Sequence, residues 1–417
     1  MVTTNAAGLI NLMDPDNFVD EMPYDELMQY LKTEPIFWHE QPERPDGGFW
    51  VLTRYADVVE VSRHADLFSS SENGAVLTPS PFQTEEERVQ SLAMMRMMML
   101  NMDPPDHTKV RSIVNKGFTP RTIGVFKERL EELTHRILDR ALEKGEGDFV
   151  VDVAAELPLE AIAEIMGVPS SDRDKIFDWS NRLIGGEDPE YQQDDPNAGL
   201  LASAELYAYA AELRKQAEGE PDPDRKDIVH KLVHTEVDGH VLDETEFELF
   251  FLLLAVAGNE TTRNAMSHGM LAFFEHPEQW DLFVKERPLG TAADEIIRWS
   301  TPVMHFQRTA MKDVEVGGQQ IKAGQRMMIV YSTANRDPEV FDDPFAFDIT
   351  RDPNPHIAFG GGGPHFCLGS HLAKLEIQVM FNAIADRMPD IRPIGESPRL
   401  RSQFINGIKH IPVSYTG

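Results

Sequence analysis

The stretch His356–Gly369 reads HIAFGGGGPHFCLG and holds the single cysteine of the chain, Cys367. Its four consecutive glycines can adopt backbone conformations closed to other residues, and they let the chain pass close to a flat or bulky ligand. A helix is predicted directly after the cysteine, over 368–388. Because backbone N–H groups at a helix start favour an anion, the thiol is placed to ionise. A thiolate is the ligand that a soft or redox-active metal requires, so the stretch predicts a metal–thiolate site.

Other interpretations of this stretch compete with a metal–thiolate site. For a lone cysteine the default is a buried, inert thiol beside a flexible turn. A nucleotide-binding loop needs Lys-Ser or Lys-Thr after the glycines, or a strand–GxGxxG–helix unit, and the sequence has neither. A zinc site is weaker still, because the chain has one cysteine and no HExxH motif.

The composition limits the classes of function. The 417 residues include 70 acidic and 39 basic side chains, which gives a net charge of −31. Such a surface repels phosphate backbones and anionic lipids, so we expect neither nucleic-acid binding nor membrane adhesion. With 41% hydrophobic and 9% aromatic residues, the chain is not of the disordered acidic type. The single cysteine excludes an intrachain disulfide.

The apolar runs predict a cytoplasmic protein without a membrane anchor. The longest strongly apolar run, Leu249–Gly258, is too short to span a bilayer and is typical of a buried helix. The N-terminal residues lack the basic region and apolar stretch of a secretory signal.

The periodicity predicts a mainly α fold with small β-sheets. The segment 49–61 indicates a strand leading into a helix, and strand-like patterns return over 303–331 with a turn at 317–318. Helical spacing is predicted over 123–144, 157–166, 202–216, 249–258 and 368–388. This pattern does not suit a doubly wound nucleotide-binding fold, and no linker or repeat divides the chain.

Two further pairs of residues are unusual for their positions. Glu260 and Thr261 follow Ala-Gly in the apolar helix, where a polar pair is costly without a purpose. A local helix irregularity, with the threonine bonding back to a carbonyl, explains them equally well. Glu295 and Arg298 share one face of a predicted helix at i, i+3, although a solvated surface pair is the default for this spacing.

Together these features resemble the cytochrome P-450 family of haem-thiolate monooxygenases, whose pattern is Phe-Gly-x-Gly-x-His-x-Cys-x-Gly. Gly363, His365 and Gly369 match it around Cys367, while Phe359 lies one residue further from the cysteine than in the commonest form. The resemblance implies one cytochrome P-450 domain over 1–417, with 1–45 as an N-terminal extension packed on it. It also implies haem b, with Cys367 as the axial ligand of the iron.

The resemblance implies roles for the remaining motifs. Glu260 would relay protons to dioxygen, and Thr261 would steady the activated oxygen. Glu295 and Arg298, with Arg351 before the cysteine loop, would form a buried structural network. The residues that the resemblance places on the haem are His107, Arg111, Arg308, His356, Phe359, His365 and Gly369. His107 and Arg111 are four apart and share a helix face, and cations of this kind would hold the two propionates, although each alone is typical of an ordinary surface charge.

The residues of several segments, among them AVAGNETTRN at 255–264, resemble those of the actinobacterial steroid 26-monooxygenase branch of that family. This implies terminal-methyl hydroxylation of a sterol side chain, such as that of cholest-4-en-3-one. Alternatives are ω-hydroxylation of methyl-branched fatty acids or terpenoids, a non-catalytic haem-binding or sensor protein, and a peroxide-driven peroxygenase. The retained Glu260–Thr261 pair argues against the last two.

The substrate pocket is expected to be apolar, with few charges, so that shape orients a lipid-like substrate. Segments 73–101 and 185–199 are expected to contribute to it, and methionine packs adaptably there. The pocket residues expected from the sequence are Met97, Met98, Leu253, Val256, Ala257, Val303, Met304, Phe306, Phe404 and Ile405.

The chain must receive its electrons from outside, because it has no flavin, nicotinamide or iron–sulfur motif. The resemblance implies a ferredoxin and its reductase as donors, with O2 as the oxidant and a monomeric enzyme. The donor would dock on the cysteine side of the haem, through Lys109, Arg111, Lys116 and Arg121, for which a solvated helix face is the plainer interpretation.

Overall fold

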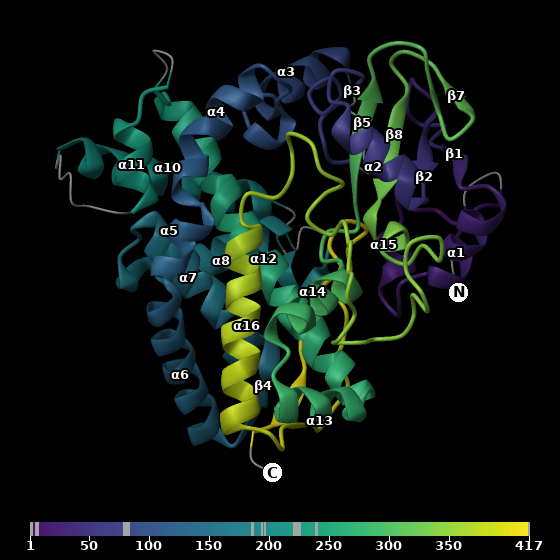
Figure 1. The fold of residues 1–417 in the computed structure, drawn as a ribbon. Helices are drawn as coiled ribbons and strands as arrows, with labels where there is room; N and C mark the ends of the chain where they lie inside the picture. The colour runs from purple at the N-terminus through teal and green to yellow at the C-terminus, as the bar shows by residue number, and fades with distance from the viewer. Residues whose placement is uncertain are drawn as a thin grey trace.

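The computed structural model describes residues 3–4, 8–77, 84–184, 187–192, 195, 197–219, 227–237 and 241–415. Parts of the segments 1–45, 73–101 and 185–199, which were singled out from the sequence, therefore lie outside the described residues. The described chain is mainly helical with small sheets, as its periodicity predicts (Figure 1).

The largest sheet has the strand order β1-β2-β8-β5-β3. Strands β2 and β8 are parallel, with Trp50 opposite Met327, and the other neighbours are antiparallel. Two smaller sheets are β4-β10-β9 and the hairpin β6-β7. The strands are β1 Ile36–Glu40, β2 Gly48–Leu52, β3 Phe68–Ser69, β4 Glu146–Asp148, β5 His305–Ala310, β6 Val314–Val316, β7 Gln319–Ile321, β8 Arg326–Val330, β9 Arg392–Pro393 and β10 Pro412–Ser414.

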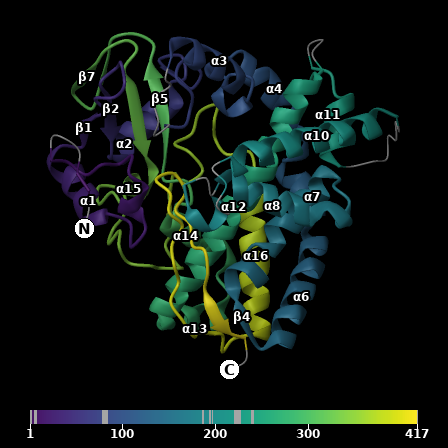
Figure 2. The ribbon, with the colours of Figure 1, turned by 180° about the vertical axis from the view of Figure 1, so that it is seen from behind.

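The helices form the larger part of the molecule, beside the main sheet (Figures 1 and 2). They are α1 Tyr24–Thr33, α2 Tyr55–Arg63, α3 Glu85–Met95, α4 Asp106–Val114, α5 Pro120–Val125, α6 Lys127–Lys144, α7 Glu156–Met166, α8 Arg173–Ile184, α9 Pro189–Gln192, α10 Ala198–Gly219, α11 Ile228–His234, α12 Glu244–Glu275, α13 Pro277–Glu286, α14 Leu289–Ser300, α15 Tyr331–Ala334 and α16 Ser370–Arg387. None of the helices in the described part combines the length and apolar character needed to cross a bilayer.

The long helix α12 runs through the helical core. Its start is fixed by a capping box, in which Asp243 accepts from the N–H of Glu246 and Glu246 accepts from the N–H of Asp243. Midway, a Cβ on Gly258 would stand 2.9 Å from the side chain of Ile162, so the absence of a side chain lets α12 lie close to α7. This close packing positions the polar residues that follow Gly258.

Part of the glycine-rich stretch before α16 packs closely on α2. Gly363 has φ +78°, and a Cβ there would collide with the carbonyl of Ser62 at the end of α2. A Cβ on Gly361 would stand 2.8 Å from the Ser62 hydroxyl. Gly360, with φ +97°, is the member of the run that borders the large cavity. The lack of a side chain at Gly361 and Gly363 is thus required for close packing on α2.

The predicted helix over 123–144 is in fact two helices. Helix α5 ends at Phe126, whose backbone N–H bonds back to Gly124 and Ile123, and α6 begins at Lys127. Helix α6 ends before Gly145, which adopts φ +74°, and the sequence predicts this end. At the N-terminus, Ile10, Leu12 and Phe18 are buried in a cluster with residues of the main sheet.

Candidate haem-binding site

A cavity of about 240 Å³ lies inside the molecule, between α12, α4, β5 and the segment that leads into α16. It gathers residues that are far apart in the sequence, from Met99 to Ile377. Of the residues assigned to a site from the sequence, its lining includes His107, Arg111, Leu253, Ala257, Thr261, Val303, Phe306, Arg308, Phe359, His365, Cys367 and Gly369.

Cys367 opens on this cavity, three residues before the first turn of α16. Its backbone N–H donates to the carbonyl of Phe359 at 2.9 Å, which closes the loop behind the thiol. Burial raises the pKa of the Cys367 thiol, while the N–H groups of Gly369 and Ser370 and the charge of Arg111 lower it. Cys367 is nevertheless exposed to the cavity, so groups that favour a thiolate act on a sulfur that a ligand can reach.

Cationic and imidazole groups gather at another part of the same cavity. Arg308 is 4% exposed, and its guanidinium donates to the carbonyl of Gln307 at 2.7 Å. Arg111 donates to the carbonyl of Phe366 at 2.5 Å. Burial lowers the pKa of Arg308 and of Arg111. No carboxylate among the described residues forms an ion pair with either guanidinium.

Two histidines lie beside these arginines. The rings of His107 and His365 are 4.3 Å apart, and His365 Nε2 lies 3.1 Å from the Ser70 hydroxyl. Burial lowers the pKa of His107 to about 4 and that of His365 to about 2, and the neighbouring arginines lower both further. His107 Nδ1 is buried without a hydrogen-bond partner in the described chain. Within the described chain the cluster is thus a set of donors without a carboxylate partner, which suits the binding of a carboxylate.

The structure places His356 next to α14, and its Nδ1 is buried without a hydrogen-bond partner in the described chain. Its Nε2 lies 3.5 Å from Asp294, a carboxylate that also pairs with Lys374 at 2.6 Å. The ring lies outside the cavity lining, because the chain turns into the cavity only at Ala358 and Phe359. Its Nε2 therefore contacts α14, and its role on the haem stays a prediction.

Thr261 and Glu260 point in different directions from α12. The Thr261 hydroxyl donates to the carbonyl of Ala257 at 2.8 Å, at the cavity surface. Glu260 is fully buried outside the lining, and one of its oxygens pairs with Arg263, which itself donates to Asn181 of α8 at 2.8 Å. Its Oε1 is buried without a partner in the described structure. Burial raises the pKa of Glu260, and the charge of Arg263 opposes this.

The structure brings Glu295, Arg298 and Arg351 together. Arg298 forms a fork–fork pair with Glu295, at 2.8 and 2.7 Å, with both side chains fully buried. It also donates to the carbonyls of Asn335, Pro344 and Ala346. Arg351 Nε lies 3.3 Å from Glu295 Oε2. The three side chains therefore tie α14 to the irregular segment that precedes the cysteine loop, at a distance from the cavity lining.

The methionine run was assigned to the pocket in the wrong register. Met97 is 36% exposed to solvent in the turn after α3, and Met98 lies outside the lining as well. The next two residues, Met99 and Leu100, line the cavity instead. Composition locates an apolar run, but the turn that ends α3 decides which of its members point inward.

Four other expected pocket residues lie behind the wall rather than in it. Met304 is buried in the cluster of the main sheet, and Ile405 is bridged to Val303. The ring of Phe404 lies 5.5 Å from that of Phe306 and supports it from behind. Val256 lies on a different face of α12 from its neighbour Ala257, since successive helix residues are 100° apart.

The sequence did not indicate several residues of the wall. They come from helices and strands whose inward faces are known only once the elements pack. They are Met99, Leu100, Phe118, Ile162, Phe250, Leu254, Thr262, Ala265, Ile297, Tyr331, Leu372 and Ile377. A signal existed for Met99 and Leu100, which lie in the segment 73–101 assigned to the pocket, and for Leu254 and Thr262, which adjoin assigned residues.

Comparison with known proteins gives the site its context. The family model described as "Cytochrome P450" matches residues 288–387. A steroid C26-monooxygenase of Mycolicibacterium smegmatis is 48% identical over 100% of this chain and 96% of its own length. A methyl-branched lipid omega-hydroxylase of Mycobacterium bovis is 40% identical over 89% of this chain and 85% of its own.

A solved structure agrees with these relatives. A cytochrome P450 of Mycobacterium marinum, determined with pseudoionone, superposes with a TM-score of 0.86 at 35% identity. The match covers 94% of each chain.

Proposed function

Since this chain belongs to the cytochrome P450 family, we propose that it is a haem-thiolate monooxygenase that hydroxylates a terminal methyl group of a sterol side chain. One atom of O2 enters the C–H bond and the other leaves as water, with two electrons and two protons consumed. The observation that carries this proposal is one cavity in which the Cys367 thiol, an apolar wall and the Thr261 hydroxyl of α12 meet.

The residues present fit haem b. Cys367 offers a single sulfur ligand from a loop closed by its own backbone. Arg111, Arg308, His107 and His365 supply donors for two propionates, and the unpartnered His107 Nδ1 is one of them. Phe359 and the other apolar residues of the lining suit the macrocycle. When bound, the haem supplies the activation of dioxygen.

The chain's own residues would supply protons and exclude water from the reacting C–H bond. In this proposal Thr261 presents its hydroxyl at the cavity surface, and Glu260 delivers protons to it from behind α12. The unpartnered Oε1 of Glu260 is the atom available for this transfer. A raised pKa suits the role, because the carboxyl then exchanges protons closer to neutral pH.

Two observations support a sterol side chain as the substrate. The steroid C26-monooxygenase relative matches the full length of the chain at 48% identity. The wall around Leu253, Ala257, Val303 and Phe306 is apolar, and it can hold a hydrocarbon by shape. A primary C–H bond is harder to attack than a secondary one. The wall must therefore admit only the end of the substrate's side chain to the reacting centre. The methyl-branched lipid hydroxylase is also similar to this chain, at the lower identity of 40%, so methyl-branched lipids are the alternative substrate class.

A binding-shift titration of the haem protein separates the two substrate classes. We expect cholest-4-en-3-one to displace water from the haem and to shift the Soret band at low concentration, with a methyl-branched fatty acid binding more weakly. A strong response to the fatty acid, with none to the sterol, would end the sterol proposal. The 26-hydroxylated product, identified by mass spectrometry in a reconstituted reaction, tests the position of attack.

We also propose a ferredoxin, served by its reductase, as the electron donor. Lys116 and Arg121 are exposed near α4, on the side of the molecule where Arg111 contacts the cysteine loop, while Lys109 pairs with Asp106. An acidic ferredoxin would be steered to these cations against a net charge of −31. Reversing Lys116 and Arg121 to Glu should slow reduction at low salt, whereas reversing Lys285 on α13 should not.

We also propose a domain organisation, a cellular location and an oligomeric state for the chain. We assign residues 1–417 to one cytochrome P450 domain, with 1–45 as an N-terminal extension, and the burial of Ile10 and Phe18 against the sheet supports this. We further propose a cytoplasmic monomer, which the sequence itself favours. Sedimentation velocity of the haem protein tests the monomeric state.

A further inference from the structure

A buried asparagine, Asn101, directly follows two residues of the large cavity's wall, Met99 and Leu100. Its side chain is 6% exposed and lies outside the lining itself. Its Oδ1 accepts from the backbone N–H of Ala75 at 2.7 Å, and its Nδ2 donates to the carbonyl of Met95, the last residue of α3, at 3.0 Å. Both ends of the amide are therefore bonded to backbone, on either side of α3 in the sequence.

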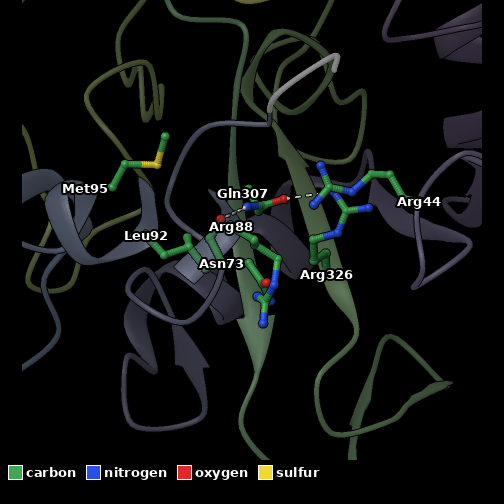
Figure 3. A pocket seen from close by; sticks show the side chains of 7 residues that line it. All are labelled: Arg44, Asn73, Arg88, Leu92, Met95, Gln307 and Arg326. Atoms are coloured by element: carbon green, nitrogen blue, oxygen red, sulfur yellow. Dashed lines mark hydrogen bonds between the residues drawn. The ribbon is translucent and has the colours of Figure 1, made fainter. Parts of the chain in front are cut away.

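Strand β5 holds the same segment before α3 (Figure 3). The backbone N–H of Gln307 donates to the carbonyl of Ala75 at 2.7 Å. Its side-chain amide donates to the carbonyls of Asn73 and Gly74 at 2.9 and 2.8 Å. The oxygen of that amide accepts from Arg326 of β8 at 3.3 Å. The segment is therefore fixed on the main sheet by both backbone and side-chain bonds.

Strand β5 also contributes to the wall of the large cavity. Successive side chains of a strand point to opposite faces. Phe306 and Arg308 accordingly line the cavity, whereas Gln307 between them lies outside its lining. The bonds of Gln307 and Asn101 meet at Ala75, one at its carbonyl and the other at its N–H. Two parts of the wall that are remote in sequence are therefore connected through one residue.

The polar bonds of Asn101 matter because the wall segment beside it is rich in methionine. All residues of 94–99 are methionines except Arg96. Methionine is unbranched and adapts to irregular apolar surroundings, so its shape does not fix the position of the backbone. A hydrogen bond is directional, and its loss would leave the buried N–H of Ala75 unsatisfied. Asn101 therefore limits where Met99 and Leu100 can lie.

We propose that Asn101 is a positioning residue that determines which C–H bond of the substrate's hydrocarbon chain is oxidised, by holding Met99 and Leu100 in place relative to β5. This inference rests on the proposed hydroxylation and adds a residue that sets the position of attack. A primary C–H bond at the chain end is harder to attack than the internal ones. A wall that shifts admits the weaker internal bonds to the reacting centre.

The test replaces Asn101 by leucine, which keeps a branched side chain but cannot bond Ala75 or Met95. We expect the ratio of terminal to internal hydroxylation of cholest-4-en-3-one to fall by about 10-fold. Mass spectrometry of the products of a reconstituted reaction measures this ratio. A variant that merely folds less well would give less product at an unchanged ratio.

A second variant acts at the other end of the connection. Gln307→Met removes the side-chain bonds to Asn73 and Gly74 and leaves the lining of the large cavity intact. It should lower the product ratio in the same direction as Asn101→Leu. The two variants therefore keep the proposal open to refutation if one of them fails to fold.

Asn17 provides the matched control. It is 7% exposed, its Oδ1 accepts from the N–H of Thr3 at 2.6 Å, and its Nδ2 donates to the carbonyl of Asn11 at 2.8 Å. It lies outside the lining of the large cavity. Asn17→Leu should keep the wild-type product ratio. An unchanged ratio in Asn101→Leu and Gln307→Met, or an equal fall in Asn17→Leu, would overturn the proposal.

Two further measurements separate this proposal from the choice of substrate. The same product ratio can be determined with a methyl-branched fatty acid, so a protein that rejects the sterol still tests Asn101. In the wild-type protein without substrate, we expect the amide hydrogen of Ala75 to exchange slowly with D2O, because it is bonded to Asn101. Exchange at the rate of a free amide would overturn the proposal whatever the substrate is.

Discussion

Glu260 is a fully buried carboxyl on the helix that carries Thr261, and its environment explains why such a costly residue is tolerated there. The pair with Arg263 compensates for burial, and Arg263 is held by Asn181. The remaining oxygen, Oε1, has no partner in the described chain. A proton taken up at Oε1 neutralises the carboxylate, and Oε2 can still accept the hydrogen bond of Arg263.

We predict that Glu260→Gln lowers the rate of product formation by about 10²-fold and raises the solvent isotope effect, because proton delivery becomes limiting. Substrate binding should change little, since Glu260 lies outside the cavity lining. The measurement is steady-state hydroxylation in H2O and D2O with a reconstituted electron donor.

The control for this variant is Glu376→Gln. Glu376 is also fully buried, in α16, outside the lining, and burial raises its pKa well above the usual value. It should therefore be protonated, and the amide should imitate it. If both variants retain the wild-type rate and isotope effect, Glu260 is a structural residue and the relay assignment is wrong.

At the scale of elements, Arg298 is the residue that joins α14 to the segment before the cysteine loop. It bonds both oxygens of Glu295 and three carbonyls while fully buried. We predict that Arg298→Met, which removes both bonds of the buried fork–fork pair with Glu295 and the donors to three carbonyls, lowers the free energy of unfolding by about 3–5 kcal/mol. Urea denaturation of the haem protein measures this.

An exposed pair provides the comparison for Arg298. Arg140 and Glu156 form an ion pair on the surface, with side chains 55% and 36% exposed. Arg140→Met should cost less than about 1 kcal/mol. A similar small loss for Arg298→Met would contradict the assignment of the buried network as structural.

His305 makes the stability depend on pH. Its Nε2 lies 2.9 Å from the carbonyl of Gln403, and its Nδ1 is buried without a partner in the described chain. Burial lowers its pKa from 6.5 to about 4. Between these values the unfolded chain binds the proton and the folded one does not, so stability is present above pH 6.5 and is lost as pH falls toward 4.

We predict that His305 contributes a loss of about 2 kcal/mol in the free energy of unfolding between pH 7 and pH 5. Denaturation at a series of pH values, compared with His305→Gln, isolates the contribution. The variant should show a shallower slope over this range. An unchanged slope would mean that His305 titrates alike in both states.

Across the whole molecule, the sequence predicts much of the chemistry and less of the shape. Cys367, Arg308 and Thr261 belong to motifs that follow one another in the order typical of the family. Their positions at the cavity could therefore be anticipated from the sequence. The contact of His356 with Asp294 could not be anticipated, because the two residues are remote in sequence. The wall also depends on packing: Met99 rather than Met97 faces inward because of the turn after α3.

The mainly helical architecture follows from periodicity, while local breaks do not. The helical spacing of apolar residues over 123–144 continues through Phe126. The backbone nevertheless closes a turn at Phe126, and a second helix starts after it. The glycine run is equally ambiguous, because freedom of φ is needed both for a ligand and for close contact with Ser62. Tertiary contacts decide between such alternatives.

The central claim is that Cys367 binds haem iron as a thiolate, and the carbon monoxide difference spectrum of the dithionite-reduced protein tests it most directly. The account predicts the strongly red-shifted Soret band of a thiolate–haem–CO complex, and its loss in Cys367→Ser. A spectrum without that band in correctly folded, haem-loaded wild type, or a band that persists in Cys367→Ser, would contradict the account.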